Sequence, residues 1–127
     1  MRSFRHSRIQ SFKHAISGWF YVIRTQQNAW IHLVATVSVV ILAAWLRLSV
    51  RDWAVLVVAV AIVWMAEFLN TALEAVVDLA SPERHPLGKV GKDVGAAAVL
   101  IAACSAAVIG FLIIGPPLWH RLSLLFV

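Results

Sequence analysis

Residues 53–78 have the sequence WAVLVVAVAIVWMAEFLNTALEAVVD, a long apolar run that ends in polar side chains. No charged residue precedes Glu67 in this segment, so it predicts a membrane-spanning helix. Four polar residues share one stripe of that helix, at about 100° per residue: Glu67, Asn70, Glu74 and Asp78. We call them the polar stripe.

The composition of the chain is that of a membrane protein. Of its 127 residues, 61% are hydrophobic and 13% are charged, whereas soluble domains have about 45–50% apolar and about 25% charged residues. The mean hydropathy is +0.85. A disordered chain, a repeat solenoid and a disulfide scaffold are excluded, because Cys104 is the only cysteine and no internal repeat occurs. We expect one all-α membrane domain over residues 1–127.

Two further apolar runs complete a set of three predicted spans. Residues 29–46 form the first span, and residues 93–115, which are uncharged after Asp93, form the third, where a pair of prolines should end the helix. A short link predicts that the first two spans are antiparallel. We expect residues 79–92 to form a cytoplasmic loop before the third span.

Residues 3–24 precede the first span and predict an amphipathic helix on the membrane surface. Aromatic and aliphatic residues recur there near helical spacing, and basic residues fall mostly on other sides. A cleaved signal peptide is the alternative. The bulky residues Trp19, Phe20 and Tyr21, and the lack of a small-residue cleavage pattern, argue against it.

The net charge of +5 indicates an orientation. Eight of the 11 basic residues precede the first span or lie in the 79–92 loop. By the positive-inside rule the N-terminus faces the cytoplasm and the C-terminus lies outside. We expect no nucleic-acid partner, because aromatic and basic residues do not interleave as in a stacking platform.

Several carboxylates in one span require an explanation, since an acid near the bilayer centre costs on the order of 3 kcal/mol. Pairing with basic residues, or contacts between helices, could account for Asp78 near the expected boundary. Glu67 and Glu74 with Asn70 between them favour chemistry instead. Two acids and an amide can hold Mg²⁺ and leave one acid to accept a proton.

Cations follow the polar stripe in the sequence. Lys89 and Lys92, with Asp93 beside them, could hold nucleotide phosphates, although a solvated cytoplasmic loop accounts for Lys89 equally well. Pro82 after Ser81 resembles the start of a helix.

His32, in the first span, lies on a polar side with Gln26, Asn28 and Thr36. Its imidazole could join the polar stripe or form a hydrogen bond between helices. The sequence leaves both roles open.

Two motifs in these segments can be compared with known families. They are Glu67-x-x-Asn70-Thr-Ala-x-Glu74-x-x-Val77-Asp78 and His85-Pro-Leu-x-Lys89-x-x-Lys92-Asp93. Together they resemble the prokaryotic diacylglycerol kinase and undecaprenol kinase family, small lipid kinases of bacterial membranes. The resemblance covers nearly the whole chain. The His-Pro-Leu-x-Lys form looks more like the undecaprenol kinase branch.

The resemblance implies a homotrimer whose active sites form between protomers at the cytoplasmic face of the inner membrane. ATP and Mg²⁺ would be cosubstrates. By position in the motif, Glu67 would be the general base for the lipid hydroxyl and Glu74 a metal ligand. Asn70 and Asp78 would support the polar site.

The resemblance also implies roles at the second motif. Lys92 would contact phosphate and be oriented by Asp93. Lys89 and His85 are further candidates for binding ATP or substrate.

Two departures from the family pattern stand out. Gln26 occupies a position where the family commonly has a glutamate that serves as a second metal ligand. A neutral amide there predicts weaker metal binding, unless Glu74 and the phosphates suffice. Glycines also replace the family's usual alanines at Gly88, Gly91 and Gly95.

The sequence thus predicts an enzyme that transfers the γ-phosphoryl group of ATP to a membrane alcohol. Undecaprenol is the preferred substrate, and diacylglycerol, which would yield phosphatidic acid, is the alternative. A small proton-coupled transporter would also carry acids in a helix but would not need Lys89, Lys92 and Asp93. A catalytically idle family member is a further alternative, suggested by Gln26.

Overall fold

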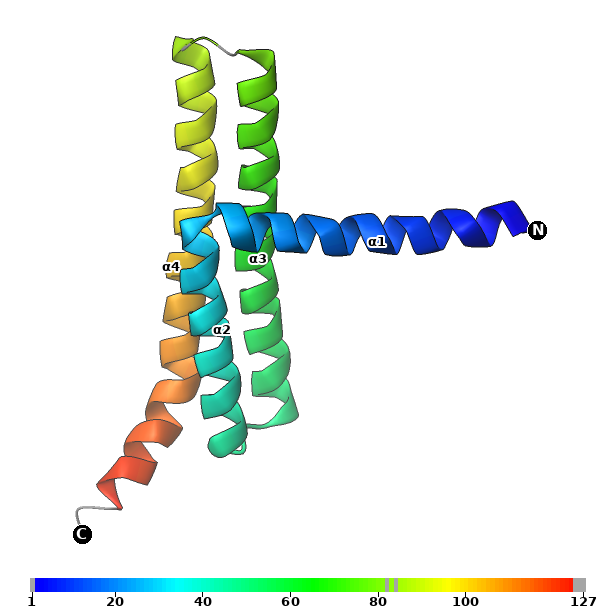
Figure 1. Cartoon of the computed structure of the whole chain (residues 1–127). Coiled ribbons are helices and arrows are strands. Elements are labelled where there is room, and N and C mark those ends of the chain that lie inside the picture. The colour runs from blue at the N-terminus through cyan, green and yellow to red at the C-terminus, as the bar shows by residue number, and fades with distance from the viewer. Residues whose placement is uncertain (1, 82, 84, 125–127) are drawn as a thin grey trace.

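The chain folds into helices joined by short connections (Figure 1). The computed structural model describes residues 2–81, 83 and 85–124. The helices are α1 (Arg2–Thr25), α2 (Gln27–Trp45), α3 (Val50–Ala80) and α4 (Pro86–Ser123). The last three are long and apolar enough to span a membrane. The predicted all-α fold with three spans and a preceding helix is confirmed.

Local backbone chemistry sets the ends of α2 and α3. Gln26 is extended, with φ −104°, and separates α1 from α2. Arg47, with φ 53°, turns the chain between α2 and α3. The Ser49 hydroxyl oxygen then accepts a hydrogen bond from the backbone N–H of Asp52 and caps α3. These caps place α2 and α3 antiparallel.

The loop predicted at residues 79–92 is longer than the connection that the structure has between α3 and α4. Helix α4 begins at Pro86, and His85 caps it through a hydrogen bond from the backbone N–H of Leu87 to Nδ1. Proline suits the first turn of a helix, because the N–H that it lacks has no partner there. The two lysines and the aspartate of this segment therefore lie on a helix. The helix start predicted at Pro82 falls outside the described residues.

The prediction that the prolines end the third long helix was also wrong. Helix α4 continues through Pro116 and Pro117 to Ser123. Proline removes a helical hydrogen bond and favours a kink, and the last turns of α4 bend away from the bundle (Figure 1). Ile114 and Leu118 pack against α2 and α3 on both sides of the prolines, which supports the helix there.

Helix α1 runs across the bundle and docks near the middle of α3 (Figure 1). The Trp19 ring lies 4.9 Å from the Trp64 ring and 4.8 Å from the Phe68 ring, measured between centroids. Val22 and Ala29 are buried beside Trp64. Between residues 8 and 25, most of the other α1 side chains are exposed, as expected for a helix lying on a membrane.

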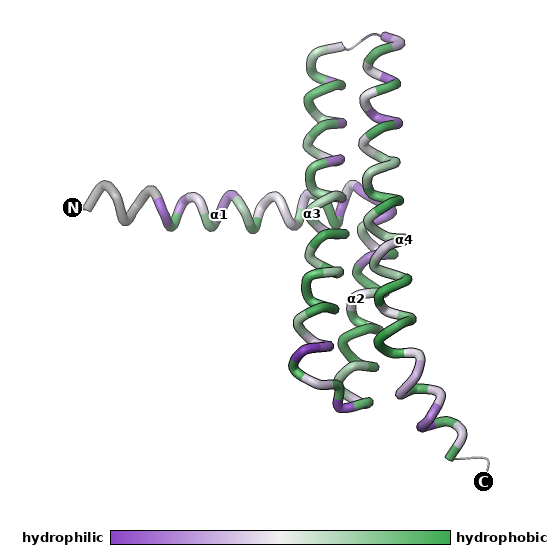
Figure 2. Tube along the Cα trace, turned by 180° about the vertical axis from the view of Figure 1, so that it is seen from behind, coloured by the Kyte–Doolittle hydropathy of each residue, from purple (hydrophilic) through white to green (hydrophobic). Residues whose placement is uncertain are grey.

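Helix lengths show where the polar stripe lies. At 1.5 Å per residue, α2 measures about 28 Å, close to the hydrocarbon thickness of about 30 Å, whereas α3 measures about 46 Å. The excess of α3 and α4 extends past α1, and Figure 2 shows polar residues along it. The polar stripe starts at the level of α1 and runs along this part of α3 toward its C-terminal end.

Candidate active site

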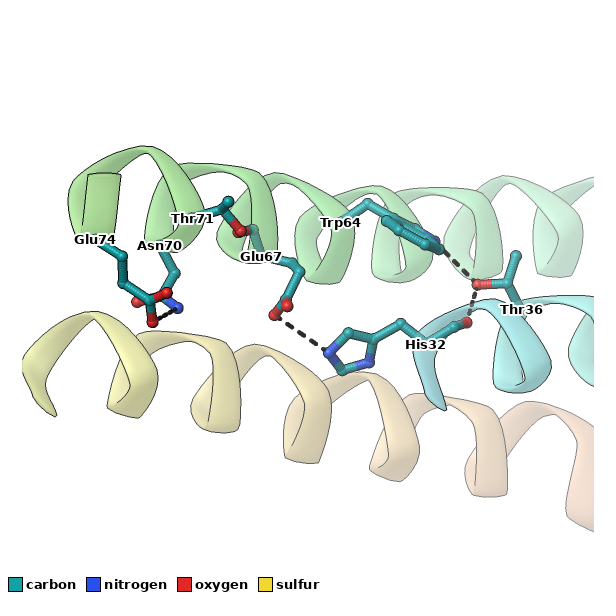
Figure 3. A network of polar contacts seen from close by, with 7 residues as sticks. All are labelled: His32, Thr36, Trp64, Glu67, Asn70, Thr71 and Glu74. Atoms are coloured by element: carbon teal, nitrogen blue, oxygen red, sulfur yellow. Dashed lines mark hydrogen bonds and ion pairs between the residues drawn. The ribbon is translucent and has the colours of Figure 1, made fainter. Parts of the chain in front are cut away.

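Glu67 is the most buried functional side chain of the polar stripe, with 1% of its surface exposed. Its Oε2 lies 3.6 Å from Nε2 of His32, and the two side chains point toward each other (Figure 3). Neither atom has a hydrogen-bond partner among the described residues. The Thr71 hydroxyl donates to the Glu67 backbone carbonyl instead. Glu67 therefore keeps a carboxylate oxygen free to accept a proton.

Two hydrogen bonds connect the backbone at His32 to α3. The Trp64 indole N–H donates to the Thr36 hydroxyl oxygen at 3.1 Å, and the Thr36 hydroxyl donates to the His32 carbonyl at 2.7 Å. The sequence left the role of His32 open. In the structure its imidazole joins the polar stripe at Glu67.

Glu74 is clamped by two amides. Asn70 Nδ2 donates to one carboxylate oxygen at 3.0 Å, and Gln26 Nε2 donates to the other at 3.2 Å. Gln26 reaches Glu74 from the junction of α1 and α2. The buried Oδ1 of Asn70 has no partner among the described residues. The amides direct their nitrogens at Glu74, so its carboxylate supplies the oxygens here of the type that Mg²⁺ prefers. The described residues contain no cluster of three or more His, Cys, Asp or Glu side chains suited to a metal.

Asp78 and the cations of α4 form two ion pairs. Lys92 Nζ lies 2.5 Å from Asp78 Oδ1, and Lys89 Nζ lies 3.1 Å from Asp93 Oδ2. Asp93 was expected to orient Lys92, but the structure pairs it with Lys89, one helical turn away. Exposed pairs of this kind contribute only about 0–1 kcal/mol. The lysines can therefore exchange their partners for a ligand at little cost.

A polar cavity of about 640 Å³ lies at the turn between α3 and α4. Its lining includes Asp78, His85, Lys89 and Lys92. It brings together the predicted phosphate-binding residues, except Asp93. The lining also holds the carboxylates of Asp78 and Glu83, which balance the charge of the two lysines. Lysine ammonium groups bind phosphate once a ligand displaces these carboxylates.

The glycines of α4 let it approach α3 closely. A Cβ on Gly95 would lie 2.3 Å from Asn70 Oδ1, and one on Gly88 would lie 3.1 Å from a Val77 methyl group. Gly91 has room for a methyl group, with Val77 at 3.8 Å. Gly95 therefore allows Asn70 to occupy its place beside Glu74.

Comparison with known proteins identifies the family. The family model for prokaryotic diacylglycerol kinase matches residues 13–114. The chain belongs to this family. Membership confirms the predicted resemblance. With its three apolar helices, the chain is an integral membrane protein.

Relatives in the family carry two different names. A diacylglycerol kinase of Synechocystis is 42% identical over 109 residues, which are 85% of this chain and 62% of that protein. An undecaprenol kinase of Bacillus subtilis is 37% identical over 109 residues, or 86% of this chain and 89% of that protein. A diacylglycerol kinase of Escherichia coli is 41% identical over 75 residues, or 59% and 62%. The chain thus spans about three fifths of the Synechocystis and Escherichia coli relatives.

His32 was not among the site residues predicted from the sequence. A polar residue inside a span was the available signal. Its partner, however, lies 35 positions away on another helix. The pairing depends on how α2 packs against α3, which helical spacing does not determine.

Proposed function

We propose that the protein is an ATP-dependent kinase that transfers the γ-phosphoryl group of ATP to the hydroxyl of a membrane lipid. The observation that carries this proposal is the buried Glu67 carboxylate, with a free oxygen, at the level where α1 meets the bundle. A lipid hydroxyl lies at this depth of the membrane. Family membership supports the same reaction.

Glu67 acts as the general base. It accepts the hydroxyl proton while the lipid oxygen bonds to the γ-phosphorus of ATP. The bond between that phosphorus and the bridging oxygen breaks, and ADP leaves. His32 positions the carboxylate and provides a partner once the proton is bound. Phosphoryl transfer depends mainly on such positioning and on neutralised charge.

The phosphates of ATP are held on the side of Glu74 that faces away from Glu67. Lys92 and Lys89 exchange their carboxylate partners for phosphate oxygens in the cavity at the α3–α4 turn, and His85 lines the same cavity. Asp78 and Asp93 keep the two lysines in place before ATP binds. This arrangement gives Asp93 a role through Lys89 instead of Lys92.

Mg²⁺ fits the oxygens around Glu74. The carboxylate of Glu74 would hold the ion together with ATP phosphates, and rotation of the Asn70 or Gln26 amide, each of which directs its nitrogen at Glu74, would add a neutral oxygen. The ion neutralises phosphate charge when it is bound. Gln26 therefore fits an active enzyme, in which it orients Glu74.

Undecaprenol is the substrate that we favour. The His-Pro-Leu-x-Lys sequence at 85–89 and the match to 89% of the Bacillus subtilis undecaprenol kinase support it. Diacylglycerol is the second candidate, favoured by the 42% identity to the Synechocystis diacylglycerol kinase. A transporter would not need Lys89 and Lys92 in a cavity beside the polar stripe.

We also propose a homotrimer in the inner membrane, with the N-terminus and active sites facing the cytoplasm. Exposed apolar side chains on α2, α3 and α4 leave room for packing between copies. The excess of basic residues before the first span and after the second supports the orientation.

A transfer assay tests the function. Purified protein in lipid vesicles receives labelled ATP, Mg²⁺ and equal amounts of undecaprenol and diacylglycerol. We expect label in undecaprenyl phosphate. Labelled phosphatidic acid would instead select diacylglycerol, and an absence of label in either lipid would refute the kinase.

A further inference from the structure

Trp64 is a buried residue of α3 to which the proposed reaction has so far given no role. Its side chain is 7% exposed and meets residues of two other helices. The indole N–H donates to the Thr36 hydroxyl oxygen of α2 at 3.1 Å, and the Trp19 ring of α1 lies 4.9 Å from the Trp64 indole ring, between centroids. Ala29 of α2 packs in the same buried cluster. Trp64 therefore joins α1, α2 and α3 at one point.

The hydrogen bond of Trp64 lies next to the pair formed by His32 and Glu67. Thr36 follows His32 by four residues on α2, and Trp64 precedes Glu67 by three residues on α3. Spacings of three and four place residues on one face of a helix. Since α2 and α3 are antiparallel, the two contacts lie one helical turn apart along the same interface (Figure 3). The hydrogen bond at Thr36 thus fixes the register of the two helices beside Glu67.

Trp64 also contacts the imidazole of His32. The two ring centroids lie 6.3 Å apart, and the rings meet edge to face with 70° between their planes. The Thr36 hydroxyl, which accepts from Trp64, donates to the His32 backbone carbonyl at 2.7 Å. Nε2 of His32 has no hydrogen-bond partner among the described residues. The direction of the imidazole therefore depends on the side chains packed around it, and Trp64 is one of them.

We propose that Trp64 is a positioning residue, which acts through Thr36 to hold the imidazole of His32 toward the Glu67 carboxylate. The inference rests on the proposed kinase function and adds a residue that acts through another side chain. A hydrogen bond between neutral groups changes an equilibrium by about threefold to tenfold. The effect on kcat should therefore be smaller than that of removing the imidazole. ATP binding should not change, because Trp64 does not line the cavity at the α3–α4 turn.

The chain offers a matched control for the Thr36 hydroxyl. The Ser38 hydroxyl, also on α2, donates to the backbone carbonyl of Val34, four residues earlier, at 2.8 Å. Ser38 is exposed and accepts no hydrogen bond from α3 within the described part of the chain. Ser38→Ala thus removes the bond within the helix alone. Thr36→Val removes the equivalent bond together with the acceptor for Trp64.

The kinetic test compares Thr36→Val, Thr36→Ser, Trp64→Phe, Ser38→Ala and the double variant of Thr36→Val and Trp64→Phe in lipid vesicles. Thr36→Val and Trp64→Phe should each lower kcat by about threefold to tenfold, with the KM for ATP unchanged. The double variant should be about as slow as the slower single variant, because both changes remove the same hydrogen bond. Thr36→Ser, which keeps the hydroxyl, and Ser38→Ala should stay close to the wild-type kcat.

A second measurement reports the position of the imidazole without any turnover. In NMR spectra of the protein in lipid nanodiscs, the ring signals of His32 are identified by their loss in His32→Gln. These signals should shift in Thr36→Val, together with the indole N–H signal of Trp64. Both should stay in place in Ser38→Ala. If Trp64→Phe does not fold, Thr36→Val, which keeps the shape of its side chain, decides alone.

Any of three results would overturn the inference. One is a wild-type kcat in Thr36→Val, or an equal fall in Ser38→Ala. Another is a double variant whose loss is the product of the two single losses. The third is a set of His32 ring signals that stay in place in Thr36→Val. If wild type transfers no phosphate to any alcohol, the proposed function fails, and the NMR spectra still decide whether Trp64 positions His32.

Discussion

The two ends of the polar stripe differ in their environment although they lie on one side of α3. Glu67 is enclosed by packed helices and faces His32, whereas Asp78 is exposed and pairs with Lys92. A buried carboxylate without a hydrogen bond is costly and is retained where it has a function. An exposed ion pair costs little to separate. We therefore propose that the stripe divides into a proton-accepting end at Glu67 and a phosphate-binding end at Asp78 and Lys92.

The largest effect should follow removal of the Glu67 charge. Glu67→Gln keeps the shape of the side chain but cannot accept the hydroxyl proton, so kcat should fall by about 10²–10⁴-fold. The Kd for ATP should stay within a factor of about two, because Glu67 does not line the cavity at the α3–α4 turn. Asp52→Asn, an exposed acid at the other end of α3, is the control. A variant that keeps its turnover would remove Glu67 from the role of base.

Loss of the imidazole should have the next largest effect. His32→Leu leaves Glu67 buried without its partner, and kcat should fall by about 10–100-fold, with the KM for ATP unchanged. His32→Gln retains a polar end and should recover part of the rate. Steady-state kinetics at saturating lipid distinguish the two variants. Equal rates in His32→Leu and wild type would exclude His32 from positioning the base.

Gly95→Ala tests the close approach of α4 to the Glu74 clamp. The added methyl group would lie 2.3 Å from Asn70 Oδ1, so the two helices must shift. We expect a loss of about 1–3 kcal/mol in the free energy of unfolding, together with reduced activity. Gly18→Ala, where a Cβ meets nothing within 4 Å, should be neutral or stabilising. Equal stability of the two variants in denaturant titrations would contradict the close contact.

The smallest effect should appear at Gln26. Gln26→Glu replaces an amide donor beside Glu74 with a second carboxylate, which attracts a divalent cation. The Mg²⁺ concentration for half-maximal activity should fall severalfold, while kcat at saturating Mg²⁺ changes little. Gln26→Ala, which removes the donor without adding charge, serves as control. An unchanged Mg²⁺ requirement in Gln26→Glu would show that this position does not affect metal binding.

Much of the fold followed from local patterns in the sequence. Uncharged runs predicted three membrane-spanning helices, and helical spacing placed Glu67, Asn70, Glu74 and Asp78 on one side. The structure brings Asn70 and Glu74 into contact, as that spacing requires. Family resemblance contributed the expected reaction and the roles of individual residues.

The errors arose where distant parts of the chain decide the outcome. Pro116 and Pro117 would end an isolated helix, but packing of the neighbouring Ile114 and Leu118 supports it. The place where α1 meets α3 depends in the same way on distant residues, through contacts of Trp19 with Trp64 and Phe68. Neither effect is visible in a hydropathy pattern.

The most direct test of the divided stripe is single-turnover phosphoryl transfer at saturating ATP, measured side by side for Glu67→Gln and Lys92→Met. We predict that Glu67→Gln binds ATP normally and transfers almost no phosphate to the lipid. Lys92→Met should need more ATP for saturation yet transfer phosphate near the wild-type rate once saturated. Rapid transfer by Glu67→Gln, or normal ATP affinity in Lys92→Met, would contradict the division between the two ends.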